Sequence, residues 1–63
     1  MAAKFRVTHQ PGKGYHFNLV ATNGQVIASS EHYETHRACL AGIESVRKNA
    51  PQAELDDPTA KKD

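Results

Sequence analysis

The chain has 63 residues, of which 38% are hydrophobic, and its eight Lys and Arg against seven Asp and Glu give a formal net charge of +1. This length allows one small domain, which buries only about 60% of the surface that its unfolded chain exposes, and it excludes a two-domain enzyme. A single cysteine, Cys39, excludes an intrachain disulfide and suits a reducing compartment. No apolar run approaches the about 20 residues of a membrane span, and residues 1–6 lack the apolar stretch of a signal peptide. We therefore expect a cytoplasmic protein that does not enter the membrane.

The first 30 residues alternate between apolar and polar side chains, as half-buried strands do. Phe5 and Val7 alternate with polar neighbours, the alternation resumes over residues 15–22, and residues 25–30 can form a return strand. In the second run, one face is expected to face the core and carries Tyr15, Phe17, Leu19 and Ala21. The pattern predicts an antiparallel β-meander of three strands.

Two turn signals separate these runs. Residues 11–14 read Pro-Gly-Lys-Gly, which is typical of a turn because proline presets φ and glycine accepts positive φ. Asn23 and Gly24 form the strongest short-range hairpin signal. They predict a type I′ turn, in which both central residues have positive φ.

The period changes in the second half of the chain. Thr35 is a suitable helix N-cap, residues 36–49 contain no proline, and Pro51 disfavours helix at the residue before it. Apolar residues recur at helical spacing and predict one buried stripe, made of Cys39, Leu40, Ile43 and Val46. Two cations in the expected last turn, Arg47 and Lys48, suit the negative end of the helix dipole.

The remaining residues follow the predicted helix and carry four of the seven acidic residues. Residues 53–56 are a candidate short edge strand, and residues 58–63 are expected to be a disordered tail. The prediction is therefore an α+β domain over residues 1–57, with a three- to four-stranded antiparallel sheet and one helix packed on one of its faces. One helix covers only one face of such a sheet, and open sheet edges favour association. The small core, the open edges and the lack of a disulfide together predict a homodimer.

Four segments of the chain resemble the YegP-like family of small bacterial and archaeal proteins of unknown function. These are Phe5-x-Val7, the run from Tyr15 to Leu19, the run from Ala21 to Glu31 around Asn23-Gly24, and the helical run from Gly42 to Ala50. The resemblance extends over residues 4–57. It implies a β-meander followed by a helix, with two tandem copies in some members and homodimers, sometimes with exchanged elements, in single-copy members. It implies no catalytic motif. The chain departs from the family at Cys39, where a small residue such as alanine is more usual, and at Pro11 in the first turn.

Metal and thiol chemistry are the least favoured alternatives to a binding function. His32, His36 and Cys39 have ligand-like spacing, but zinc needs three or four converging ligands, and His32 precedes the predicted helix. The other two histidines, His9 and His16, lie on predicted strands. A reactive cysteine needs a lowered pKa, whereas Cys39 lies on the apolar stripe, where free cysteine packs as a small hydrophobe. We expect no catalytic residue, no metal and no cofactor.

Nucleic-acid binding is the main alternative to this binding function. Residues 1–50 carry a charge of +3 and residues 51–63 a charge of −2. The cations that could contact phosphate are Lys4, Arg6, Lys13, Arg37, Arg47 and Lys48. The sequence nevertheless favours a non-enzymatic homodimeric binding or interaction module, whose partner is an unidentified protein or small ligand. Its candidate interaction surface consists of His32, Tyr33, Arg37, Arg47 and Lys48.

Overall fold

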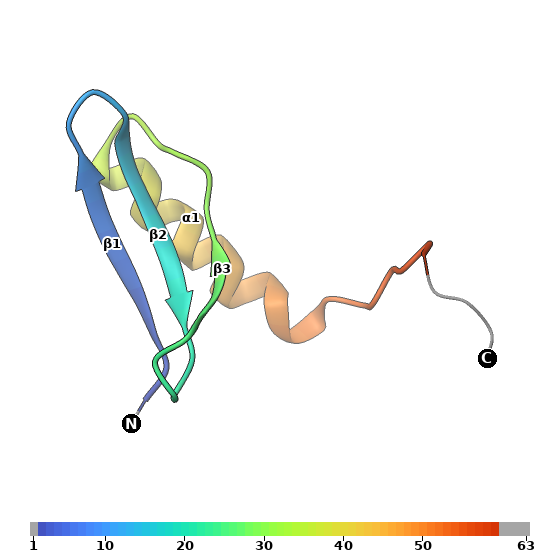
Figure 1. Cartoon of the computed structure of the whole chain (residues 1–63). Coiled ribbons are helices and arrows are strands. Elements are labelled where there is room, and N and C mark those ends of the chain that lie inside the picture. The colour runs from blue at the N-terminus through green and yellow to red at the C-terminus, as the bar shows by residue number, and fades with distance from the viewer. Residues whose placement is uncertain (1, 60–63) are drawn as a thin grey trace.

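A computed structural model of the chain describes residues 2–59. The elements are β1 (Lys4–Gln10), β2 (Gly14–Val20), β3 (Val26–Ser29), α1 (His36–Asn49) and the short 3₁₀ helix η1 (Ala50–Gln52). The strands form one antiparallel sheet in the order β1-β2-β3, with α1 packed behind it (Figure 1). The predicted α+β meander with one helix is therefore confirmed.

The core lies between β2 and α1. Phe17, Cys39 and Ile43 are buried there, and five half-buried side chains surround them: Phe5, Val7, Tyr15, Tyr33 and Val46. Phe17 meets Phe5 edge to face, with ring centroids 5.8 Å apart. The predicted inward face of β1 and β2 thus supplies the core, although Leu19 is half-buried outside this cluster. The helical stripe is confirmed except at Leu40, which is 43% exposed, because it lies about 100° around the helix from Cys39.

The helix has the predicted bounds and cap. Thr35 has extended backbone angles, and its Oγ1 accepts a hydrogen bond from the amide of Ala38 at 3.0 Å. This bond satisfies one of the free amides of the first turn. The helix ends at Asn49, and Pro51 lies within η1.

Both β-turns depend on a glycine with positive φ. In the first, Lys13 N–H donates to the carbonyl of Gln10 at 2.9 Å, and Gly12 has φ 82°, which together with Pro11 fits a type II turn. The type I′ prediction for the second turn is wrong, because Gly24 has φ 89° while Asn23 does not have positive φ. Gly24 N–H instead donates to the carbonyl of Ala21 at 2.9 Å, and the Asn23 side chain accepts from Gln25 N–H at 3.1 Å. The hairpin loop is therefore one residue longer than predicted.

The return strand is shorter than predicted because β3 contains a bulge and then leaves the ladder. Leu19 pairs with Ala28 and Val20 pairs with Val26, which leaves Ile27 as the extra residue. Beyond β3, Ser30 N–H donates to the carbonyl of Phe17, and Ser30 Oγ accepts from Phe17 N–H, both at 2.9 Å. The serine side chain thus replaces a backbone partner of β2.

Residues 53–59 lie beyond η1 and extend away from the sheet and helix (Figure 1). All seven are exposed, and residues 53–56 belong to no strand, so the candidate fourth strand is not formed within the described chain. Of the predicted disordered tail, Pro58 and Thr59 form part of a turn, and residues 60–63 lie outside the described residues.

Candidate functional site

The face of the sheet opposite α1 carries the candidate site. Side chains alternate across a strand, and the register pairs Lys4 with Val20, Arg6 with Asn18, and Thr8 with His16 on this side. We define the helix-free face as Lys4, Arg6, Thr8, Gln10, His16, Asn18, Val20, Val26, Ser29 and His32. Val20 is 8% exposed although it lies outside the core cluster, because the neighbouring strands and their side chains cover it.

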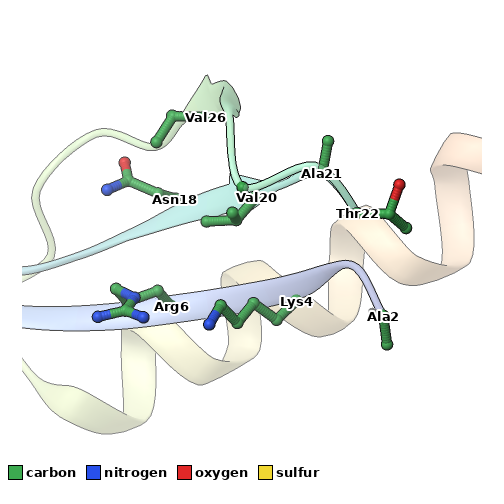
Figure 2. Close-up of a pocket in the computed structure, with 9 residues that line it drawn as sticks. Ala2, Lys4, Arg6, Asn18, Val20, Ala21, Thr22 and Val26 are labelled. Atoms are coloured by element: carbon green, nitrogen blue, oxygen red, sulfur yellow. The ribbon is translucent and has the colours of Figure 1, made fainter.

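One end of this face forms a shallow groove of about 220 Å³. Arg6 and Lys4 follow β1 along one side, and Asn18 and Val20 follow β2 beside them (Figure 2). The remaining lining residues are Ala2, Ala21, Thr22, Gly24 and Val26. The predicted inward orientation of Ala21 is therefore wrong, because the hairpin turn begins there. The groove combines two cations with an apolar floor.

The other end of the face carries two imidazole rings. His16 and His32 have ring centroids 5.2 Å apart, and His32 Nε2 lies 2.9 Å from Gln10 Oε1 in a hydrogen bond. Nδ1 of His16 is buried and has no hydrogen-bond partner within residues 2–59. Asn18 and Ser29 lie between these rings and the groove. Ser29 Oγ donates a hydrogen bond to Asn18 Oδ1 at 2.8 Å.

The five residues predicted as an interaction surface do not form one surface. His32 lies on the helix-free face, and Tyr33 is half-buried, with its ring stacked on Phe17 at 6.3 Å. Tyr33 therefore contributes mainly to the core, and its backbone pairs with Tyr15 through hydrogen bonds of 2.8 and 2.7 Å. Arg37 is exposed at the start of α1, about 15 Å along the axis from Arg47. Arg47 forms an exposed ion pair of 3.6 Å with Glu44, and Lys48 beside it is also exposed.

The metal candidates are separated in space. His36 lies beside Tyr15, with ring centroids 5.5 Å apart, whereas His32 faces the other side of the sheet, beside His16. Within residues 2–59 no three His, Cys, Asp or Glu side chains gather as a set of metal ligands. No helix in this part of the chain is long and apolar enough to cross a membrane.

Cys39 is buried in the core, as predicted, with no exposed surface. Burial raises the pKa of its thiol, which disfavours the nucleophilic thiolate. We expect a water-soluble disulfide reagent to label native Cys39 at least about a hundredfold more slowly than the unfolded chain, because labelling needs an opening of the core. Labelling of the native chain at the rate of a free thiol would contradict this placement.

The raised pKa also gives stability a pH dependence. The folded chain keeps the neutral thiol, whereas the unfolded chain ionises from about pH 8.5. The neutral thiol therefore contributes fully to the free energy of unfolding below that pH. This contribution is lost as the pH rises through the raised pKa of the folded chain. Denaturant titrations between pH 7 and 10 measure this loss, and Cys39→Ala is the control that lacks it.

Residues that sequence reasoning missed are the glycines that allow close packing and the amide of Asn18. Gly14 and Gly42 both face Tyr33, and only tertiary contacts reveal this. The groove itself had a signal in the sequence, because residues 1–30 contain Lys4, Arg6 and Lys13 but no Asp or Glu.

Comparison with known proteins identifies the family. A family model described as a domain of unknown function (DUF1508) matches residues 12–57. A UPF0339 protein of Treponema denticola is 53% identical over 53 residues, which cover 84% of this chain and 91% of that protein. A UPF0339 protein of Methanosarcina acetivorans is 45% identical over the same shares.

A longer relative and a solved structure extend this comparison. A UPF0339 protein of Pseudomonas aeruginosa is 50% identical over 50 residues, which cover 79% of this chain but 46% of that protein. The NMR solution structure of a protein from Haloferax volcanii is similar in fold, with a TM-score of 0.78, 36% identity, and coverage of 87% of this chain and 93% of that one. The chain therefore belongs to the DUF1508 family.

Proposed function

We propose that the chain is a small non-enzymatic binding module of the YegP-like kind that works as a homodimer. The observation that carries the proposal is the amount of surface left uncovered. A compact monomer of 6.9 kDa exposes about 4,000 Å², whereas this chain exposes 5413 Å². A standard interface covers about 800 Å² per partner, so a second copy can cover part of this excess, to which the exposed residues 53–59 contribute.

Apolar side chains in three parts of the chain supply the surface for the second copy. Ile27 on the edge strand β3 is 62% exposed, Leu40 on α1 is 43% exposed, and Leu55 beyond η1 is 92% exposed. The extended segment around Leu55 lies away from its own sheet (Figure 1). The outer edges of β1 and β3 are unpaired within the described residues and can accept backbone hydrogen bonds from another chain. We infer that residues 53–57 pack on the partner subunit.

The length of the Pseudomonas aeruginosa relative supports pairing. This chain spans 46% of that protein, which leaves room for a second unit of the same size. The resemblance to a family with tandem members agrees with a pair as the working unit. A binding role is favoured over catalysis because Cys39 is buried with a raised thiol pKa and the groove is shallow. A cytoplasmic location is proposed because the lone cysteine suits a reducing compartment.

Solution mass tests the dimer. We expect light scattering behind a sizing column to give twice 6.9 kDa at low micromolar concentration. Leu55→Asp should weaken association by about a hundredfold or more, because a symmetric interface buries the leucine twice and each burial contributes about 1.5–3 kcal/mol.

Thr22→Asp is the matched control, since it adds the same charge at an exposed position of the hairpin turn. It should leave the mass unchanged. A folded monomer of the natural sequence at all concentrations would overturn the homodimer, and equal dissociation by both variants would overturn the assignment of Leu55 to the interface.

A further inference from the structure

We propose that the helix-free face binds a single strand of nucleic acid, with the phosphates on Lys4 and Arg6 and the bases on the His16–His32 end. This inference rests on the proposed binding function and names its ligand. It uses a surface separate from the edges and apolar groups assigned above to the second copy.

The charge distribution is the first argument. All seven acidic residues lie at position 31 or later, so the three strands carry none. Lys4 and Arg6 form no ion pair with any residue between 2 and 59, where the helix cation Arg47 pairs with Glu44. Two free cations on a face without acidic strand residues attract phosphate, whose contacts supply most of the affinity for nucleic acid. A net charge of +1 conceals this local excess.

The groove supplies the second argument. Arg6 and Lys4 extend beside Asn18 and Val20 on the same surface (Figure 2). Val20, together with the 55% exposed Val26, offers an apolar floor beside the cations. An anion with an attached apolar, planar group fits this combination, and a nucleotide has both parts. The Asn18 amide lies between the cations and the histidines and can bond to a base edge.

The two rings at the other end give the third argument. His32 is exposed, and its ring lies 5.2 Å from that of His16. Bases of single strands stack on planar side chains, including histidine. The exposed ring of His32 beside His16 is therefore the place for a base to stack.

The spacing of these groups favours an extended polymer over a mononucleotide. Residues on one face of a strand recur about every 6.8 Å, so Lys4, Arg6 and Thr8 form a row along β1. A strand that follows this row runs from the groove to the rings. In a duplex the bases are already stacked on one another and cannot stack on protein side chains. Only the duplex backbone could contact this shallow face, so we expect the single strand to bind more tightly.

Fluorescence anisotropy with labelled 12-nucleotide single strands of DNA and RNA tests the proposal at several salt concentrations. The double variant Lys4→Ala, Arg6→Ala should weaken binding by about tenfold or more and reduce the slope of log affinity against log salt by about 1.4, since each lost phosphate contact reduces it by about 0.7. The matched control Arg47→Ala, Lys48→Ala removes the same charge from the end of α1 and should change affinity by less than about twofold. His32→Ala should weaken binding by about fivefold or more with the salt slope unchanged, because stacking does not depend on counterion release.

Several results would overturn the proposal. These are no binding at low salt, equal losses for the two double variants, tighter binding of the matching duplex, and equal competition by poly-glutamate, which would show a general anion surface. Circular dichroism checks that each variant is folded, and the solution mass is measured on the same samples. Binding by a monomer would contradict the homodimer alone, and a dimer that does not bind would contradict the nucleic-acid proposal alone.

Discussion

Replacing Gly14 by alanine is expected to destabilise the fold by about 3–5 kcal/mol, enough to unfold most of a domain of this size. Gly14 has φ 98°, and a Cβ at this position would lie 2.2 Å from the carbonyl oxygen of Tyr33. That carbonyl accepts a hydrogen bond from Tyr15 N–H at 2.8 Å. The methyl group would therefore separate the segment before α1 from β2, besides the strain of a positive φ. Thermal and denaturant unfolding followed by circular dichroism measure the loss.

Gly12 and Gly24 provide matched controls for Gly14. Their φ values are 82° and 89°, and a Cβ at either position meets nothing within 4 Å. Alanine at Gly12 or Gly24 should lower the free energy of unfolding by about 1–2 kcal/mol, through the strain of a positive φ alone. An equal loss for all three variants would show that the contact with Tyr33 contributes nothing.

Gly42→Ala is expected to destabilise the fold by about 2–3 kcal/mol, although alanine favours a helix over glycine by about 1 kcal/mol. A Cβ on Gly42 would lie 2.5 Å from the hydroxyl oxygen of Tyr33, 2.9 Å from Cζ of the same ring and 3.4 Å from Phe17 Cε2. The tyrosine ring stacks on Phe17, so moving it away from the added methyl group disturbs that stack, and overpacking of this kind is destabilising. Denaturant unfolding measures the change.

Two variants separate packing from helix propensity at Gly42. Ala41→Gly, at the neighbouring exposed position, should cost about 1 kcal/mol through propensity alone. Tyr33→Leu shortens the side chain, so Gly42→Ala should cost less in that background than in the natural sequence. A stabilising Gly42→Ala would contradict the close packing of Tyr33 under the helix.

The sequence was most informative about local structure. The helix has the predicted bounds, and Thr35 caps it, because a cap, a helical stripe and a following proline all act within a few residues. The inward face of the strands was predictable from alternation for the same reason. The hairpin at Asn23-Gly24 was predicted at the right place but with the wrong turn type, because the Asn23 side chain satisfies Gln25 N–H in a loop that keeps asparagine at negative φ.

Predictions about surfaces were less accurate. His32 and Tyr33 are adjacent in the sequence but lie on opposite sides of the sheet, one beside His16 and the other against Phe17. The sequence does not show that this segment is extended and bridges to Tyr15, which puts the two side chains on opposite sides. Leu40 follows the helical stripe in sequence but is exposed, because it lies about 100° around the helix from Cys39.

By itself, the sequence determined the α+β class, the three strands, the helix, the buried thiol and the absence of acidic residues from the first 30 positions, since each of these depends on composition or on contacts close in the chain. Only the tertiary structure decided that Tyr33 packs between Gly14, Gly42 and Phe17, that β3 carries a bulge, and that Lys4 and Arg6 share a groove with Asn18 and Val20. These features depend on strand register and on contacts between residues distant in the sequence. A one-residue shift in strand pairing would move the side chains of a strand to the opposite face of the sheet.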